Sequence, residues 1–401
     1  MNEDELRILL TPEAQDLLSE LGPLESTDAA TTAVTRLRKA GRPAELVAVV
    51  VAQARLRGRA GPKFGEVASG LLLTDAGLQQ ATRREVADWH ARRMRAAGVT
   101  TVADLGCGIG ADSLAFAAAG MSVRGVERDP ATAAIAAFNL RTHPGAEIRR
   151  AEAETAGLDG VDGIWLDPAR RTSSRRLNDP RDWSPSLGFA FGLGERYPTG
   201  VKLGPGLERS LIPDDAEATW VSVHREVVEL VTWHGAAARP GVRRAALVLG
   251  AGGPHELTAP ADSPDVEPGP LGAYLLEPDG AVIRARLIGD LARSLPGNAR
   301  MLDPTIAWIT TDEAPVTAFG QSFRVVAELP VDEKALRREL AARGIGALEI
   351  KVRGLGVDPD AFRRRVLPKA RASRERGEAR SATLVLTRIA GRRRAILAER
   401  A

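Results

Sequence analysis

A glycine-rich turn directly after an apolar stretch constrains the fold of this chain more than any other feature. Residues 102–110 have the sequence VADLGCGIG, and a helix-like run from Ala111 to Ala119 follows them. Glycine tolerates left-handed backbone angles and has no side chain that would keep a ligand away from the backbone N–H groups. A strand, a glycine turn and a helix in this order predict a doubly wound α/β fold that binds a ligand at the turn.

The next apolar stretch, residues 122–126, leads into an acidic residue, Glu127. A carboxylate at this place can accept hydrogen bonds from both hydroxyls of a ribose. A dinucleotide-dependent oxidoreductase could carry a similar pair of features. However, the glycines follow a G-x-G-x-G spacing instead of G-x-G-x-x-G, and Asp104 beside them would repel a pyrophosphate. The same carboxylate could pair with a cationic amino acid group.

The composition is that of a globular protein with room for two or three domains. Of the 401 residues, 44% are hydrophobic and 27% are charged, so disorder is not expected. The single cysteine, Cys107, excludes an intramolecular disulfide and a cysteine-based zinc site, and the histidines lack metal-ligand spacing. The acidic N-terminus does not resemble a signal peptide, and the best apolar run, residues 46–54, is too short to span a bilayer. We therefore expect a cytoplasmic enzyme without a metal or a membrane segment.

Charge is divided unevenly along the chain. Residues 331–401 contain 19 Lys and Arg against 9 Asp and Glu, a net charge of +10, whereas the preceding residues carry −7. A basic C-terminal part predicts a polyanionic partner, because phosphate contacts dominate nucleic-acid affinity. An arginine-rich composition could also produce this charge as a merely solvated face. The cations expected to hold RNA are Arg363, Arg364, Arg365, Lys369 and Arg371.

The hydrophobic pattern predicts four parts. Residues 1–76 are mostly helical, with Thr11 as an N-cap and a second helix over 44–56 that leads into a basic, glycine-containing loop. Residues 251–322 combine a proline-rich linker with a small α/β (ferredoxin-like) segment, and residues 323–401 follow a βαβαββ pattern. Residues 77–250 alternate strands and helices, which predicts a parallel sheet closed by a hairpin around 220–229. Its expected strands are 101–105, 122–126, 147–150, 162–166, 199–203, 218–224 and 244–250.

A further strand-like stretch, residues 163–166, ends in Asp167, Pro168, Ala169 and Arg170. With the glycine turn and the acidic residue after the second strand, it resembles the class I S-adenosylmethionine-dependent methyltransferases. In that fold the cofactor lies across the carboxyl ends of the strands. The resemblance implies that Asp104 meets the methionyl ammonium or ordered water, that Glu127 holds the ribose and that Glu152 meets the adenine amino group. The other cofactor-binding residues that it implies are Gly106, Gly108, Gly110, Gln80 and Thr82.

Thr82 also has a purely structural interpretation. It stands before a helix-like run, and Glu85 follows three residues later. This spacing is typical of a capping box, in which the threonine hydroxyl caps the helix N-terminus.

Methyl transfer is predicted to take place around Asp167. The reaction is an in-line displacement, so the protein mainly positions the nucleophile, in some enzymes with a base. Many methyltransferases that act on nucleic-acid amines carry Asp/Asn-Pro-Pro-aromatic here, whereas this chain has Ala169 and Arg170 at the last two positions. Asp167 can still hold an amine, Arg170 can stack on a base or bind phosphate, and Lys202 can bind phosphate or pair with Asp167. Methylation of pyrimidine C5 lacks its nucleophile, because Cys107 lies in the glycine turn.

Five motifs occur in a characteristic order: LQQAT at 78–82, the glycine turn, DPARR at 167–171, VKLGPG at 201–206 and LEP at 276–278. With the basic C-terminal part, they resemble the bacterial THUMP-like domain-containing methyltransferases, which are distantly similar to trimethylguanosine synthases. The resemblance implies a Rossmann-like seven-stranded methyltransferase sheet with an N-terminal helical region and a small C-terminal α+β (THUMP-like) domain.

The same resemblance implies S-adenosyl-L-methionine as the cofactor and RNA as the substrate, with an exocyclic amine of a tRNA or rRNA base as one acceptor. Two alternatives stay open. The chain could be a small-molecule or protein methyltransferase, or an RNA-binding protein with a degenerate catalytic domain. The intact Asp104, the three glycines, Glu127 and Asp167 argue against the last alternative.

Overall fold

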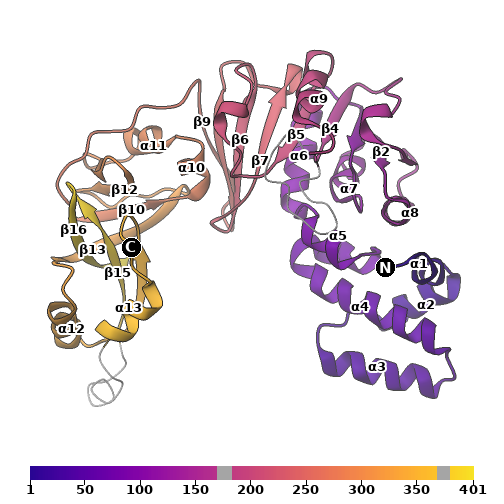
Figure 1. The fold of residues 1–401 in the computed structure, drawn as a ribbon, viewed down its shortest axis with the longest axis horizontal. Helices are drawn as coiled ribbons and strands as arrows, with labels where there is room; N and C mark the ends of the chain where they lie inside the picture. Colours follow the sequence, from indigo (N-terminus) through magenta and orange to yellow (C-terminus); the bar gives the residue numbers. More distant parts are fainter. Residues whose placement is uncertain (169–182, 368–379) are drawn as a thin grey trace. The chain divides into compact units, whose positions relative to one another are not determined.

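The computed structural model describes residues 1–168, 183–367 and 380–401 (Figure 1). The chain divides into two compact units: residues 1–217 with 230–240, and residues 218–229 with 241–401. Among the described residues, none of the helices combines the length and the apolar character that a membrane span requires. Within the same residues, no group of three or more His, Cys, Asp or Glu side chains is arranged to hold a metal ion.

The N-terminal residues form a set of helices with an apolar core. The predicted cap is confirmed, because the Thr11 hydroxyl accepts a hydrogen bond from the N–H of Ala14 at the start of the second helix. Buried leucine, valine and alanine side chains of these helices form one cluster, which also includes Ile109 and Ile135. The bounds are Glu3–Leu9 (α1), Pro12–Leu21 (α2), Thr27–Lys39 (α3), Ala44–Phe64 (α4) and Asp75–Gln80 (α5).

The basic stretch after the apolar part of α4 is helical, whereas the sequence predicted a loop. The helix continues through two glycines and a proline to Phe64. A Cβ at Gly58 would lie 2.3 Å from the carbonyl oxygen of Leu24, so this glycine allows close packing. Arg57 is buried and donates a 2.8 Å hydrogen bond to the carbonyl of Leu71. The loop prediction was wrong because these tertiary contacts outweigh the low helix propensity of glycine.

Within the described residues, a first sheet has nine strands in the order β3-β2-β1-β4-β5-β7-β6-β8-β9 (Figure 1). Strands β1 to β5 pair in parallel, and β7 runs antiparallel to β5. The central strands β1, β4 and β5 are short buried runs, as expected for parallel strands covered on both faces. The bounds are Thr101–Leu105 (β1), Ser122–Glu127 (β2), Ala146–Arg150 (β3), Gly163–Leu166 (β4), Thr199–Leu203 (β5), Glu217–Val223 (β6), Glu226–His234 (β7), Arg244–Gly250 (β8) and Gly253–Ala259 (β9).

The strand order reverses at β1. From β1 the chain builds outward to β2 and β3, and then crosses to β4 and β5 on the other side of β1. The carboxyl ends of β1 and β4 therefore form the topological switch point, where a doubly wound sheet binds its ligand. The glycine turn follows β1 and Asp167 follows β4, so the fold brings the two main predicted motifs together. The helices of this region are Arg84–Ala96 (α6), Ala111–Ala118 (α7), Pro130–Asn139 (α8) and Leu187–Gly192 (α9).

The sequence predicted most of this sheet and missed its full width. All seven expected strands are present within one residue at each end, and the expected hairpin joins β6 to β7. In the part of the chain that the structure describes, the sheet has nine strands instead of seven, because β7 and β9 also belong to it. β9 falls in the stretch predicted as a linker, where Gly253 and Pro254 indicate a turn. Antiparallel pairing with β8 makes it a strand.

The described residues also form a second sheet, whose seven strands have the order β11-β12-β10-β13-β16-β15-β14. The βαβαββ pattern predicted for residues 323–401 is confirmed, and β10 pairs with β13, so the preceding segment shares this sheet. Its helices are Gly280–Arg284 (α10), Ile288–Ser294 (α11), Glu333–Ala342 (α12) and Pro359–Val366 (α13). Its strands are Tyr274–Pro278 (β10), Arg300–Asp303 (β11), Ile306–Thr311 (β12), Gly320–Leu329 (β13), Ile345–Val352 (β14), Arg380–Ile389 (β15) and Arg392–Arg400 (β16).

Aromatic side chains fix α6 against the first sheet. The ring centroid of His90 on α6 lies 4.2 Å from that of Trp165 on β4, and the His90 side chain is fully buried. Trp89 packs edge-on against Trp233 of β7 at 5.5 Å. Because these rings interlock, His90 has a defined position relative to the strand that precedes Asp167.

Candidate active site

The glycine turn between β1 and α7 is anchored by its own backbone. The N–H groups of Gly106 and Cys107 donate to the carbonyl of Val126 on β2, at 2.9 and 3.0 Å. The three glycines of the turn have φ angles of 89°, 55° and 88°, which L side chains rarely adopt. A Cβ at Gly108 would meet nothing within 4 Å, whereas one at Gly106 would lie 3.3 Å from the carbonyl oxygen of Asp167. The turn therefore offers open backbone at Gly108 and lies against Asp167 at Gly106.

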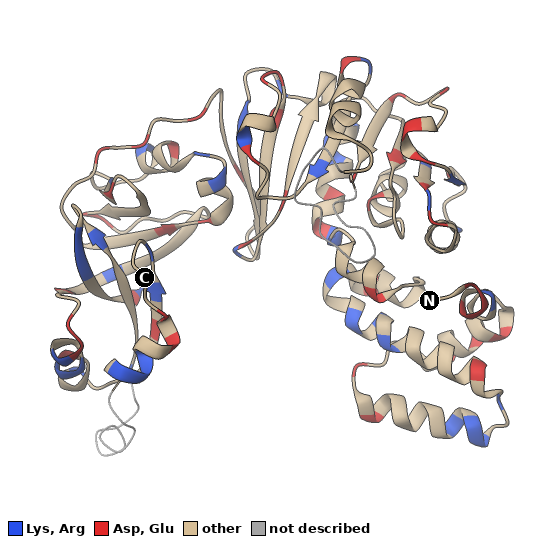
Figure 2. Cartoon of the chain, viewed as in Figure 1, with Lys and Arg blue, Asp and Glu red and all other residues tan. Residues whose placement is uncertain are grey.

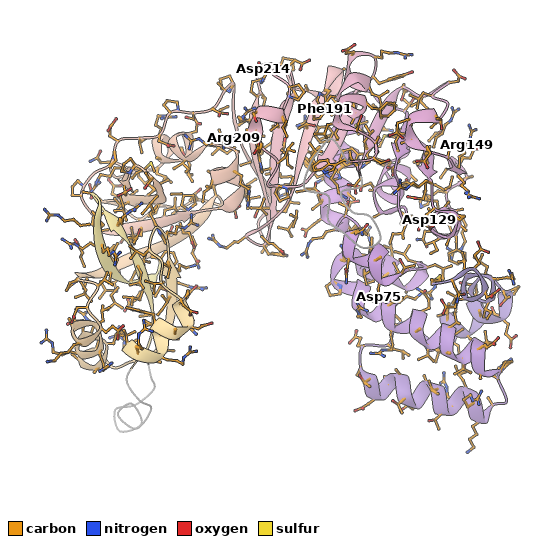
Figure 3. The ribbon with its side chains drawn as sticks, in the orientation of Figure 1. Asp75, Asp129, Arg149, Phe191, Arg209 and Asp214 are labelled. Atoms are coloured by element: carbon orange, nitrogen blue, oxygen red, sulfur yellow. The ribbon has the colours of Figure 1, made fainter. Side chains whose placement is uncertain are left out.

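Glu127 at the end of β2 directs its carboxylate at the same turn. Its Oε2 accepts a hydrogen bond from the N–H of Gly108 at 3.1 Å, and its Oε1 accepts one from the N–H of Asp129 at 2.9 Å. Asp129 caps the start of α8 and is labelled in Figure 3. A carboxylate has about four acceptor sites, so acceptor capacity is left for other donors. This geometry permits the predicted contact with a ribose, which stays a prediction.

Asp104 on β1 is enclosed by the fold. Its side chain is 1% exposed, and its Oδ2 accepts a 2.6 Å hydrogen bond from the Ser113 hydroxyl of α7. Burial, together with the nearby Asp112 carboxylate, raises the pKa of Asp104 to about 8, although the Ser113 hydrogen bond opposes this shift. The carboxyl is therefore mostly protonated at neutral pH. A neighbouring ammonium group would favour the ionised form, so the predicted role of Asp104 stays a prediction.

Asp167 and Lys202 meet at the ends of neighbouring strands. β4 and β5 pair with Leu166 beside Val201, which places the next residues of both strands side by side. Lys202 Nζ lies 2.5 Å from Asp167 Oδ2, and the two side chains are 10% and 33% exposed. One of the two roles predicted for Lys202, pairing with Asp167, is confirmed. The pair presents a partly exposed carboxylate next to the glycine turn, where it can accept a hydrogen bond from a substrate N–H.

A line of hydrogen bonds runs from this pair into the interior. Lys202 Nζ donates to Thr82 Oγ1 at 2.9 Å, and the Thr82 hydroxyl donates to Asp112 Oδ2 at 2.6 Å. Asp112 Oδ1 lies 2.8 Å from Nδ1 of His90. Because an ammonium can only donate, the Thr82 hydroxyl must accept from Lys202 and send its own proton to Asp112. We call His90, Asp112, Thr82, Lys202 and Asp167 the Asp112 network.

Asp112 is the buried anion of this network. Burial by itself raises the pKa of its carboxyl, but the hydrogen bond and charge of His90, with Lys202 and Thr82, bring the pKa below its usual value. An ionised carboxylate only accepts hydrogen bonds, so Nδ1 of His90 is the protonated ring nitrogen that faces Asp112. Both carboxylate oxygens of Asp112 therefore have defined partners.

The predicted capping role of Thr82 is wrong. α6 begins at Arg84, and the residue before it makes no side-chain cap. The Thr82 hydroxyl instead contacts the Asp112 carboxylate, which lies 30 positions later in the chain. The spacing of Thr82 and Glu85 indicates a cap, but the sequence does not reveal a buried anion on a neighbouring helix that competes for the hydroxyl.

The other predicted site residues lie in varied surroundings. Gln80 is the exposed last residue of α5, and Glu152 is exposed just before the short 3-10 helix Ala153–Thr155 (η2). Their contacts with a cofactor stay predictions. Arg170 lies outside the described residues. Cys107 is buried, and burial raises the pKa of its thiol well above the usual value, so it is poorly suited as a nucleophile.

The helix α4 brings a further cation near the site. Lys63 donates hydrogen bonds to the carbonyls of Leu78 and Gln79, at 2.7 and 3.2 Å. Burial, followed by repulsion from Lys202 and Arg83, lowers the pKa of Lys63 to about 8. The sequence flagged the basic stretch that contains Lys63, but not its proximity to Lys202.

Sequence reasoning missed Asp112, His90 and Ser113. Asp112 lies in the first turn of α7, where an acidic residue is an ordinary helix-stabilising feature. His90 is a lone histidine on a helix face that contacts the sheet, and such a residue is usually part of the core. A polar residue pair on α7, directly after the glycine turn, was the only signal that could have drawn attention to Asp112 and Ser113.

Comparisons with known proteins agree with this architecture. Residues 320–400 match the THUMP domain-like family, and residues 2–60 match a domain of unknown function (DUF8688). An uncharacterized S-adenosylmethionine-dependent methyltransferase of Mycobacterium tuberculosis strain H37Rv is 35% identical over 344 residues, which cover 83% of this chain and 90% of the relative. The counterpart in strain CDC 1551 matches equally well.

A solved structure has a similar fold over the whole length. A protein of Porphyromonas gingivalis W83, assigned as a methyltransferase, aligns with 100% of this chain and 99% of its own, with a TM-score of 0.68. The two sequences are 21% identical.

Proposed function

We propose that this chain, which belongs to the S-adenosylmethionine-dependent methyltransferases, transfers the methyl group of its cofactor to RNA. The acceptor that the site favours is an exocyclic amine of a tRNA or rRNA base. The observation that carries the proposal is the Asp167–Lys202 pair beside the glycine turn, in a chain that also has a basic, THUMP-like part.

The residues around the glycine turn suit S-adenosylmethionine. Gly108 leaves open space that a side chain would fill, and Glu127 keeps acceptor capacity for ribose hydroxyls. Asp104 is a carboxyl that a nearby ammonium would ionise. In the proposal these residues hold the cofactor, with Gln80 and Glu152 at its edge. When bound, the cofactor supplies an electrophilic methyl group on a sulfonium.

In the proposed mechanism, Asp167 orients the acceptor. Its carboxylate accepts a hydrogen bond from the exocyclic N–H and so turns the nitrogen toward the methyl group, and such orientation supplies much of the rate of a displacement. Pairing with Lys202 favours the ionised form of Asp167. After transfer the methylated nitrogen must lose a proton, and Asp167 is placed to accept it.

Charge supports RNA as the substrate. THUMP domains bind RNA, and the part of the chain that matches this family carries many Lys and Arg side chains, drawn blue in Figure 2. Arg338 on α12, Arg364 on α13, and Arg392 and Arg393 on β16 are exposed, and their side chains form no ion pair with another described residue. Such side chains can contact phosphates without breaking an existing ion pair.

The cations predicted from the sequence are partly engaged. Arg363 lies 3.2 Å from Asp360, and Arg365 lies 2.7 Å from Glu333. Exposed ion pairs of this kind contribute little energy, so a phosphate can replace the carboxylate. Lys369 and Arg371 lie outside the described residues.

RNA binding at increasing salt tests the proposed substrate class. Each lost phosphate contact lowers the slope of log K against log[salt] by about 0.7 to 0.9. We expect the double variant Arg392→Gln/Arg393→Gln to lower this slope by about 1.5 while S-adenosylmethionine affinity stays unchanged. The matched control is Arg38→Gln/Lys39→Gln, which removes two adjacent exposed charges from α3. Equal slopes in wild type and the β16 variant would favour a small-molecule or protein substrate.

A further inference from the structure

The inner half of the Asp112 network has no role in the function proposed so far. We propose that Asp112 is a positioning residue that acts through the Thr82 hydroxyl to hold the Lys202 ammonium against Asp167. The catalytic consequence rests on the proposed function, but the claim about Lys202 does not depend on any substrate.

The buried ammonium of Lys202 needs a second anion, besides Asp167, to stabilise its charge. Its side chain is only 10% exposed, and burial disfavours a charged amine. Lys63 on α4 repels this charge, whereas Asp167 pairs with it and the mostly protonated Asp104 interacts with it weakly. Asp167 is 33% exposed and must also serve the substrate. Asp112 is enclosed, so solvent screens its attraction less.

Hydrogen bonds hold the Asp112 carboxylate and the Thr82 hydroxyl each in one orientation. One oxygen of Asp112 contacts His90, whose ring packs against Trp165, so the carboxylate cannot turn freely. The other oxygen accepts from Thr82, which is 5% exposed and accepts from Lys202 in turn.

The network therefore holds the ammonium of the flexible Lys202 side chain with residues on rigid helices and strands. Its members come from α6, the segment before α6, α7, β5 and the end of β4. A site is more precise when neighbours on helices and strands lock its rotamers. In this account the substrate meets Asp167 in one position because Lys202 cannot move away from it.

Competitive labelling of lysines measures this hold without RNA or cofactor. The chain has six lysines, and Lys39 and Lys334 are exposed, so they provide internal reference rates. The full-length protein is treated with acetic anhydride at pH 8, and modification is quantified by mass spectrometry. Asp112→Asn keeps the size of the side chain, removes its charge and turns one of its two acceptor oxygens into an N–H₂ donor. Loss of a partner charge lowers the pKa of an amine by about one unit or more, so Lys202 should label about 10-fold faster relative to the references.

A matched pair of variants at Thr82 tests the path. Thr82→Val removes the hydroxyl and should also accelerate Lys202 labelling, whereas Thr82→Ser keeps the hydroxyl and should label like wild type. The double variant Asp112→Asn/Thr82→Val should label no faster than the faster single variant, because both changes break the same connection. Unchanged labelling in Asp112→Asn and Thr82→Val, or equal labelling in Thr82→Ser and Thr82→Val, would overturn the proposal.

Methyl transfer to RNA gives the catalytic readout. We expect kcat, measured on folded protein at saturating S-adenosylmethionine, to fall about 10- to 100-fold in Asp112→Asn and Thr82→Val, because small misplacements of reacting groups have effects of this size. Thr82→Ser should restore most of the activity. If labelling changes as expected while the wild type methylates no RNA, the positioning role stands and the substrate proposal fails. If Asp112→Asn and Thr82→Val methylate RNA like wild type and their Lys202 labels at the wild-type rate, the positioning role is wrong and the proposed function stands.

Discussion

At the scale of single residues, Asp104 on β1 and Asp162 just before β4 have carboxyl pKa values that are shifted in opposite directions. Burial, with the charge of Asp112, raises the pKa of Asp104 to about 8. Burial would also raise the pKa of Asp162, but hydrogen bonds from Thr100 and Thr101 lower it below the usual value. The two residues should therefore couple folding to pH in opposite directions.

Asp104 should make the cofactor-free protein less stable as pH rises. Its folded pKa of about 8 lies above the ordinary value of 3.8, so above about pH 4 the unfolded chain releases a proton that the folded state retains. Asp104→Asn removes this pH-dependent loss of stability, because an amide does not ionise. We expect the variant to be more stable than wild type by more than about 1 kcal/mol at pH 8, with a smaller difference near pH 4. Urea unfolding between pH 4 and pH 8 measures the difference in the free energy of unfolding. A difference that does not change with pH would contradict the raised pKa of Asp104.

Asp162→Asn is the control with the opposite sign. A lowered folded pKa stabilises the protein above the unfolded value of 3.8 and loses this effect as pH falls through the folded pKa. The variant should therefore be less stable than wild type at pH 7, and the difference should shrink in acid. The same unfolding series records both variants.

Glu127 should contribute strongly to cofactor affinity. In Glu127→Gln one oxygen becomes an N–H₂ donor that faces a backbone N–H, so the side chain loses its orientation as well as its charge. We expect S-adenosylmethionine to bind about 10- to 100-fold more weakly, as for hydrogen bonds to charged groups. Calorimetry compares this variant with Glu147→Gln, which alters an exposed carboxylate on β3 that pairs with Arg149. Similar affinities for the two variants would remove Glu127 from the proposed site.

At the scale of elements, two glycines of the turn between β1 and α7 have different roles, one in packing and the other in the proposed ligand binding. A Cβ at Gly110 would lie 2.9 Å from Leu140 Cδ1 at φ 88°, whereas one at Gly108 would enter open space at φ 55°. We expect Gly110→Ala to cost about 2–4 kcal/mol of stability, from backbone strain and overpacking. Gly108→Ala should cost about 1 kcal/mol and mainly weaken cofactor binding. Unfolding and calorimetry on both variants separate the effects, and an unchanged affinity in Gly108→Ala would contradict a cofactor at this turn.

The regular elements were predictable because their signals are local. The strands are short apolar runs, and the carboxyl ends of parallel neighbours meet, which is why Asp167 and Lys202 were placed together from the sequence. The misses depend on contacts between distant segments. Gly58 can lie inside the helix α4 because the backbone of Leu24 packs closely against it. β9 forms because β8 is available to pair with it.

The candidate site was predictable to the same limited degree. Glu127 follows from the glycine turn and strand spacing. The inner part of the Asp112 network does not, because Thr82 and Asp112 lie on different elements and each has an ordinary local interpretation. Only the packing of α6 and α7 brings His90 within 2.8 Å of Asp112.

At the scale of the whole molecule, the proposed chemistry and the positive charge belong to different parts of the chain. The glycine turn and the Asp167–Lys202 pair lie in one compact unit, and the THUMP-like part lies in the other. Residues 331–401 carry a net charge of +10. A division of labour follows from the proposal, in which one unit transfers the methyl group and the other contributes phosphate contacts.

The most direct test of this account is transfer of labelled methyl from S-adenosylmethionine into total RNA that lacks the modification made by this protein. Wild type and Asp167→Ala are compared, with cofactor binding measured for both. We predict label that RNase releases, that the variant does not incorporate, and that nucleoside analysis assigns to an exocyclic amine. If wild type binds the cofactor and leaves RNA unlabelled, RNA is not the substrate, and the search turns to small molecules and proteins.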